Sequence, residues 1–139
     1  MAKIKREVTF DHAAVATDQV EKLKRVLKLI GLTDEGSEQV SSQGIVAHFL
    51  KPNAGQSMVE VLEVADPQGT VAKFLAKKGP GVHHLSFRVS SDLEGLCVEL
   101  KAQGIRLVYE KPQPGAHQTK VNFIHPESTG GVLIEISQK

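Results

Sequence analysis

Two histidines and two glutamates occupy matching places in the two halves of this 139-residue chain, and together they could bind a divalent metal ion. His12 lies in FDHAAVAT and His84 in HHLSFRV, and each is followed about 50 positions later by a glutamate inside an apolar run, Glu60 in MVEVLEV and Glu135 in VLIEIS. A carboxylate in an apolar strand is costly unless it is paired or bound to a metal. Two imidazoles and two carboxylates suit Zn, Mn, Fe, Co or Ni, with positions left for water or substrate oxygens.

Simpler interpretations compete with this one. A single histidine is more often a satisfied structural residue than a ligand, and the two glutamates could be solvated charges on exposed strand faces. The chain also has no local metal spacing such as HExxH. Neighbouring strand residues face opposite sides, so only one residue of the pair His83 and His84 is expected to bind, and the repeat selects His84. The remaining histidines have no counterpart in the other half and are expected on the surface or in loops: His48, His117 and His125.

The elements that must position these residues form an internal repeat with a period of about 72 residues. Each half reads as a short strand, a helix that ends at a glycine (Gly31 or Gly104), and three extended stretches. We therefore expect an α+β fold in which two tandem βαβββ modules form a paired, curved mixed sheet around a central metal cleft. The modules span about 10–64 and 83–137, a linker helix spans about 70–79, and the whole of 1–139 is one domain.

Local patterns give bounds for the two module helices. Asp18 with Glu21 resembles a helix start signal, and Ser91 with Glu94 resembles a capping box. Cys97 falls on the apolar stripe of the second helix, so we expect it in the core. The segment 112–120 contains two prolines and a glycine, which predict a loop there.

Bulk composition excludes several classes of function. With 17 basic and 16 acidic residues the net charge is +1, which lacks the basic footprint of nucleic-acid binding. No apolar run approaches the roughly 20 residues that span a bilayer, and the start MAKIKREVTF does not resemble a signal peptide. One cysteine excludes an internal disulfide, which makes the cytoplasm the expected compartment.

Several stretches resemble those of methylmalonyl-CoA epimerases, which are glyoxalase-like proteins of the vicinal-oxygen-chelate superfamily. They cover nearly the whole chain: FDHAAVA, SQGIVAHFL, VEVLEV, TVAKFLAKKGPGVHHLSFRV, AQGIRLVYEKPQPGA and NFIHPESTGGVLIEI. The resemblance implies a homodimer with one divalent metal, an acyl-CoA substrate, and inversion of a stereocentre through an enolate. It places the metal ligands on His12, Glu60, His84 and Glu135, of which Glu135 would also move the proton.

Two departures from that family leave other functions open. Some relatives carry a second catalytic glutamate at the position of Ala47, and the loop GAHQ (115–118) differs from a Gly-rich version in many relatives. The second proton carrier is therefore unassigned, with water, His48 or another residue as candidates. A glyoxalase-like isomerase of a thiol conjugate and a metal-free ligand-binding module are the alternatives. An anionic CoA tail could meet one of several lysines: Lys73, Lys77, Lys78, Lys111 or Lys120.

Overall fold

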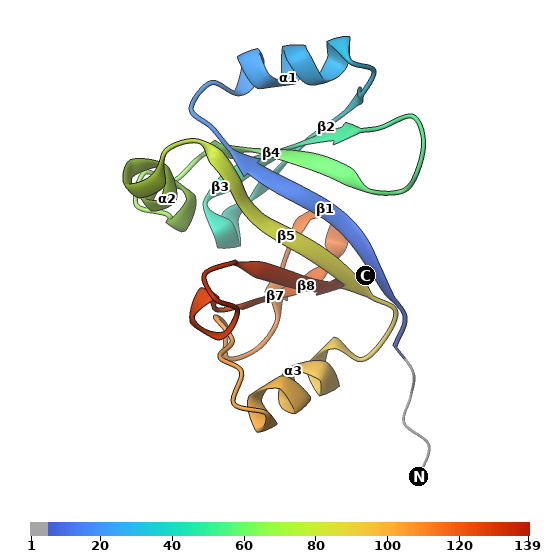
Figure 1. The fold of residues 1–139 in the computed structure, drawn as a ribbon, viewed down its shortest axis with the longest axis vertical. Helices are drawn as coiled ribbons and strands as arrows, with labels where there is room; N and C mark the ends of the chain where they lie inside the picture. Colours follow the sequence, from blue (N-terminus) through green and yellow to red (C-terminus); the bar gives the residue numbers. More distant parts are fainter. Residues whose placement is uncertain (1–5) are drawn as a thin grey trace.

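A single curved sheet of eight strands is the centre of the molecule. The computed structural model describes residues 6–139. The helices and strands are, in chain order, β1 (Val8–Ala16), α1 (Val20–Leu29), β2 (Thr33–Val40), β3 (Ile45–Lys51), β4 (Met58–Val64), α2 (Thr70–Lys78), β5 (Gly81–Val89), α3 (Leu93–Ala102), β6 (Gln113–Pro114), β7 (Lys120–Ile124) and β8 (Ile134–Gln138). Figure 1 shows β1 and β5 side by side in the middle, with α1 and α3 at opposite ends.

The strand order repeats the same pattern in both halves. The order is β2-β3-β4-β1-β5-β8-β7-β6, and β1 pairs parallel to β4 as β5 pairs parallel to β8. The first strands of the two halves, β1 and β5, pair antiparallel and join the halves into one mixed sheet. The predicted α+β fold with a paired, curved mixed sheet is confirmed. None of the described helices is long and apolar enough to cross a membrane.

The apolar core consists of two clusters, one for each half. The first gathers around Ala14, Ala16, Ala47, Phe49 and Leu62, which come from β1, β3 and β4. The second lies under α3 and includes the buried thiol of Cys97, as the apolar stripe predicted. Each cluster fixes the strands of its own half, so the β1–β5 pairing determines how the two halves face each other.

The helix ends follow the predicted glycines, but the predicted starts are wrong. Gly31 and Gly104 both adopt positive φ values (117° and 79°) just after α1 and α3. The residue before α1 is Gln19, and its side chain makes no capping hydrogen bond, so the Asp18 start signal fails. The cap of α3 is Asp92, one residue after the predicted Ser91, and its carboxylate accepts a hydrogen bond from the Gly95 N–H. A capping pattern has several acceptable registers, and packing of the helix selects one.

The second half is less regular than the first. The segment 112–120, predicted as a loop, contains the two-residue strand β6 and a short 3₁₀ helix, Ala116–Gln118. Two prolines in this segment lack the N–H groups that a longer ladder needs. Deeper in the sheet the Asn122 side chain substitutes for backbone pairing, because it exchanges two 3.1 Å hydrogen bonds with the backbone of Tyr109.

Candidate metal centre

Strand pairing brings the repeated polar residues to the centre of the sheet. Ser86 lies opposite His12 on one side and opposite Glu135 on the other, while Ala14 lies opposite both His84 and Glu60. The four predicted ligands therefore come from the four central strands β4, β1, β5 and β8. All four are buried, with exposed fractions of 2–6%.

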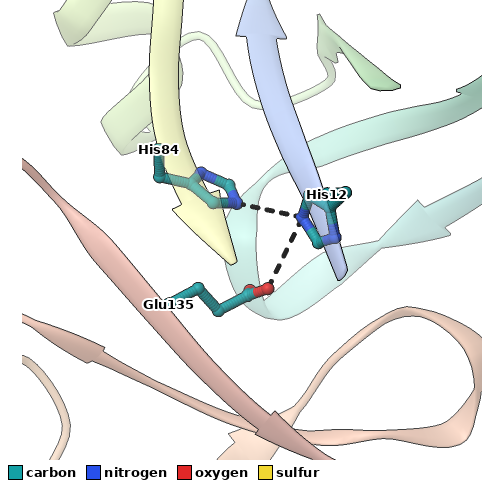
Figure 2. A group of neighbouring side chains, drawn as sticks. All are labelled: His12, His84 and Glu135. Atoms are coloured by element: carbon teal, nitrogen blue, oxygen red, sulfur yellow. Dashed lines mark hydrogen bonds and ion pairs between the residues drawn. The ribbon is translucent and has the colours of Figure 1, made fainter. Parts of the chain in front are cut away.

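Three of the four converge on one point. The Nε2 atoms of His12 and His84 are 3.4 Å apart, and Glu135 Oε1 is 3.6 Å from His12 Nε2 (Figure 2). Two ligands bound about 2.1 Å from one ion at angles of 90–110° are separated by about 3.0–3.5 Å. The spacing and the mixture of imidazole and carboxylate donors therefore fit a divalent transition metal.

Glu60 approaches the other nitrogen of His12. Its Oε2 lies 2.9 Å from His12 Nδ1, a nitrogen that Asp11 Oδ2 also contacts at 2.7 Å. Asp11, His12 and Glu60 form a second cluster of donors that shares His12 with the first. A carboxylate at Nδ1 would fix the tautomer of His12 and leave Nε2 free to bind an ion. As a direct ligand, Glu60 stays a prediction, and so do the other three assignments.

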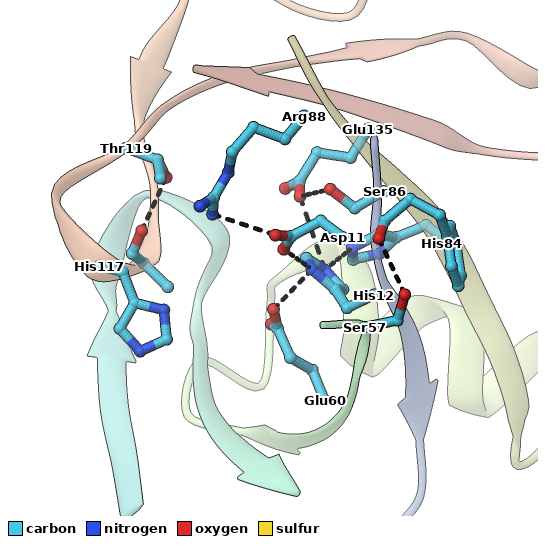
Figure 3. A network of polar contacts seen from close by, with 12 residues as sticks. Asp11, His12, Ser57, Glu60, His84, Ser86, Arg88, His117, Thr119 and Glu135 are labelled. Atoms are coloured by element: carbon cyan, nitrogen blue, oxygen red, sulfur yellow. Dashed lines mark hydrogen bonds and ion pairs between the residues drawn. The ribbon is translucent and has the colours of Figure 1, made fainter. Parts of the chain in front are cut away.

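Asp11 is a site residue that sequence reasoning missed. Strict alternation would turn it away from the side that His12 faces. The pairing of β1 with β5 shifts register between Phe10 and His12, and Asp11 occupies this irregularity. Its carboxylate thereby reaches both His12 and Arg88, with Arg88 Nη2 at 3.2 Å from Asp11 Oδ1 (Figure 3). The only sequence signal for Asp11 is that an acidic residue stands next to a predicted ligand, His12.

Burial and close charges shift the proton affinities of the site. Burial favours neutral His12, but hydrogen bonds to Asp11 and Glu60 and the charge of Glu135 outweigh it and raise the pKa of His12 to about 10. Burial raises the pKa of Glu135 to about 7, although His12 and the Ser86 hydroxyl favour its ionised form. Burial, with the charges of His12 and His83, lowers the pKa of His84 well below its usual value.

His83 contacts the Nδ1 side of the His84 ring. The Nδ1 atoms of the two rings are 2.8 Å apart, and His83 also packs edge-on against Phe74 of α2. If His84 bound an ion through Nε2, its Nδ1–H could donate to His83. Both histidines line a cavity of about 510 Å³ between α2 and the segment before β8. Its walls carry Lys73, Lys77 and Lys78 together with apolar side chains.

His48 does not lie at the surface as predicted. It is buried, with only 8% exposed, on the face of β3 that packs against α1. Its Nδ1 lies 3.3 Å from the ammonium of Lys24, and its Nε2 lies 2.8 Å from Glu63. The lysine and the glutamate compensate the burial of the polar His48 ring. Both are distant from His48 in the sequence, so the sequence alone does not reveal these contacts. His48 faces away from Ala47 and Phe49, whose side chains belong to the first core cluster.

The other two histidines are in the expected surroundings. His125 caps the short 3₁₀ helix Pro126–Ser128. His117 is exposed in the loop 115–118, where its ring stacks on Phe49 at 4.1 Å between centroids. It lines one rim of a narrow pocket beside His12, whose walls also include Asp11, Glu60 and Glu135.

Comparison with known proteins finds relatives that match most of this chain. Residues 11–123 match the model of the glyoxalase/bleomycin resistance protein/dioxygenase superfamily. The mitochondrial methylmalonyl-CoA epimerase of Bos taurus is 34% identical over 131 residues, which cover 92% of this chain and 73% of the relative.

Solved structures of the same family superpose along most of the chain. The crystal structure of methylmalonyl-CoA epimerase from Mycobacterium tuberculosis is 35% identical, with a TM-score of 0.87, covering 93% of this chain and 86% of that one. A Streptomyces coelicolor methylmalonyl-CoA epimerase variant in complex with 2-nitronate-propionyl-CoA is 28% identical, with a TM-score of 0.86, covering 94% and 96%. The chain belongs to the glyoxalase/bleomycin resistance protein/dioxygenase superfamily and, within it, to the methylmalonyl-CoA epimerase family.

Proposed function

We propose that this chain is an isomerase that interconverts the (R) and (S) forms of methylmalonyl-CoA with one divalent metal. The observation that carries the proposal is the convergence of His12, His84 and Glu135 in a buried site, in a chain that shares its fold and about a third of its residues with epimerases of this substrate. Cobalt, manganese, nickel, zinc and iron all accept such donors.

Proton removal is the step that the site must assist. The α-carbon of methylmalonyl-CoA lies between a thioester and a carboxylate, so loss of its proton gives an enolate-like anion. A bound divalent metal would stabilise the negative charge that develops on the thioester oxygen. His12, His84 and Glu135 would hold that ion, with Glu60 either as the fourth ligand or, like Asp11, as a partner that orients His12 through Nδ1.

Glu135 is the proposed proton carrier on one face of the substrate. A carboxyl group with a pKa of about 7 is matched to proton transfer near neutrality, and burial raises the pKa of Glu135 to that value although the Ser86 hydroxyl opposes it. Tight ligation would weaken it as a base, so this role needs a loosely held carboxylate. His48 is not available as the second carrier, because it is buried against Lys24 and Glu63 under α1. Water or another group must reprotonate the opposite face.

The cavity behind His84 is the proposed place for the CoA tail. It is adjacent to the donor cluster, and three lysines of α2 line it beside an apolar surface. Ammonium groups suit CoA phosphates and apolar walls suit the pantetheine chain. The other candidates, Lys111 and Lys120, line a separate surface depression near β6. The homodimer and the cytoplasmic location stay predictions.

Hydrogen–deuterium exchange at C2 of methylmalonyl-CoA tests the proposed activity. Metal-loaded protein in deuterated water should exchange the C2 proton and invert the centre. Glu135→Ala should lose both metal and turnover while remaining folded, whereas the exposed control Glu127→Gln should keep both. Turnover in the Glu135 variant would contradict the assigned role.

The same protein preparation discriminates the alternatives. A hemithioacetal turned over in preference to methylmalonyl-CoA would indicate a glyoxalase-like isomerase. Elemental analysis that finds no metal, together with no exchange by folded, metal-supplemented protein, would favour a ligand-binding module and reject the epimerase.

A further inference from the structure

Two buried polar atoms in the described part of the chain have no hydrogen-bond partner, and both belong to residues that line the pocket beside His12. They are the Nε of Arg88 and the hydroxyl of Ser137. Arg88 on β5 and Ser137 on β8 lie directly opposite each other in the parallel pairing of these strands. Buried donors without a partner are uncommon in proteins, and two that share one pocket indicate a place for an acceptor.

Arg88 is held in position by its other end. One terminal nitrogen of its guanidinium contacts Asp11 Oδ1 at 3.2 Å, and this ion pair leaves Nε free. The charged residues that share the pocket wall include Asp11, Glu60 and Glu135, which favour a cation, whereas Arg88 is the one guanidinium among its lining residues. A guanidinium offers a planar set of N–H donors that matches a carboxylate, and a serine hydroxyl adds a further donor.

We propose that Arg88 and Ser137 bind the free carboxylate of a malonyl-type acyl group, and this rests on the proposed function. Ser137 is two residues beyond Glu135 on the same face of β8, about 7 Å along the strand. The α-carbon is one bond from the carboxylate. A carboxylate held between Arg88 and Ser137 would therefore present the α-carbon towards Glu135, the proposed proton carrier.

Entry of an acyl group requires a rearrangement of one loop. The 3₁₀ helix Ala116–Gln118 and Thr119 help to close the pocket over these donors. Exposed contacts connect this loop to the first half, a hydrogen bond from Ser42 Oγ to the Pro114 carbonyl and one from the His117 N–H to Glu38. Such exposed bonds are readily exchanged for water, so the loop can shift to admit substrate.

Two ligands that differ only by the carboxylate test this subsite. Methylmalonyl-CoA carries it, and propionyl-CoA lacks it. Calorimetric dissociation constants would be measured on metal-loaded wild-type protein, Arg88→Gln, Ser137→Ala and the exposed control Arg106→Gln, with metal content and thermal unfolding checked for each. Ser137→Ala removes only a hydroxyl, so it still tests the subsite if Arg88→Gln does not fold.

The expected result is a loss confined to the carboxylate ligand. Arg88→Gln should weaken methylmalonyl-CoA binding roughly 10- to 100-fold and Ser137→Ala about fivefold, as loss of a charged and a neutral hydrogen bond would. Propionyl-CoA binding should change less than about twofold in both variants, and Arg106→Gln should change neither ligand. Equal weakening of both ligands, or no weakening, would overturn the subsite.

The two proposals fail in different ways. Wild-type protein that exchanges the C2 proton, with variants that do not discriminate the ligands, overturns the carboxylate subsite alone. Wild-type protein that prefers methylmalonyl-CoA over propionyl-CoA through Arg88, yet exchanges no proton, overturns the epimerase and keeps the subsite. Failure to bind either thioester overturns both.

Discussion

The position of Glu60 beside His12 Nδ1 leads to a prediction about a conservative substitution. If Glu60 acts by accepting the Nδ1–H of His12, or by offering one oxygen to the ion, a glutamine oxygen can do the same. We expect Glu60→Gln to raise the metal dissociation constant less than about tenfold and Glu60→Leu about 10- to 100-fold, the usual cost of losing an orienting partner. Titration with a competing chelator measures both.

The matched pair separates two roles for this side chain. Equal losses in Glu60→Gln and Glu60→Leu would mean that the negative charge, and not the acceptor oxygen, is what the site uses. No loss in either variant would show that Glu60 plays no part in metal binding.

Alternation along strands predicted where most of the site lies, and its failures have local causes. His12, His84 and Glu135 lie together because all three face the same side of the sheet. Asp11 reaches the same place only through a register shift, which the sequence does not reveal. His48 is buried because Lys24, from a helix 24 positions away in the chain, compensates its ring. Long-range compensation of this kind is a property of tertiary packing.

At the scale of elements, the cap of α3 gives a quantitative prediction. Asp92 adopts a left-handed conformation (φ 54°) while its carboxylate accepts the Gly95 N–H at 3.0 Å. Asp92→Ala should lower the free energy of unfolding by about 1–2 kcal/mol, because it loses the cap and places alanine at positive φ. Asp92→Asn should cost less, since asparagine caps helices and tolerates this conformation. Urea denaturation measures both.

The neighbouring serine provides the control for that experiment. Sequence patterning selected Ser91 as the cap, but the observed capping bond comes from Asp92. Ser91→Ala should therefore change the free energy of unfolding by less than about 0.5 kcal/mol. A larger loss in Ser91→Ala than in Asp92→Ala would restore the predicted register of the capping box.

Element type was easier to predict than element length. Apolar runs and terminal glycines indicated the strands and helices of both halves, because burial dictates those patterns. The short strand β6 was not predicted, since prolines limit the ladder and the Asn122 side chain takes over the pairing deeper in the sheet. A side chain that takes the place of a backbone hydrogen-bond partner leaves no pattern that can be recognised in a single sequence.

For the molecule as a whole, the buried charges of the site are unfavourable to folding, and a bound metal would offset that cost. Three carboxylates and two imidazoles meet where the two halves join: Asp11, Glu60, Glu135, His12 and His84. Neither half supplies all four of the predicted ligands, so the β1–β5 pairing brings them together as it closes the sheet. The stability of the metal-free protein should therefore depend on protons that stand in for the ion.

The direction of that dependence follows from two raised pKa values. The folded pKa of His12 is about 10 against an ordinary 6.5, so its contribution to stability is present below pH 6.5 and is lost as the pH rises towards 10. The folded pKa of Glu135 is about 7 against 4.5, so its contribution is complete below pH 4.5 and is lost as the pH rises through 7. In both cases the folded state binds more protons than the unfolded state, and rising pH destabilises it.

Metal-free protein should therefore lose thermal stability between pH 6 and pH 9, while metal-loaded protein should lose much less. Metal binding requires deprotonated ligands, so the ion replaces protons that the metal-free site would otherwise hold. The difference in Tm between loaded and chelator-treated protein should widen as pH rises, and scanning calorimetry at fixed metal concentration measures it. In metal-free Glu135→Gln the fall in Tm around pH 7 should flatten, whereas Glu127→Gln should retain it. A Tm difference independent of pH would mean that protons and metal do not compete at His12 and Glu135, and it would remove these residues from the metal centre.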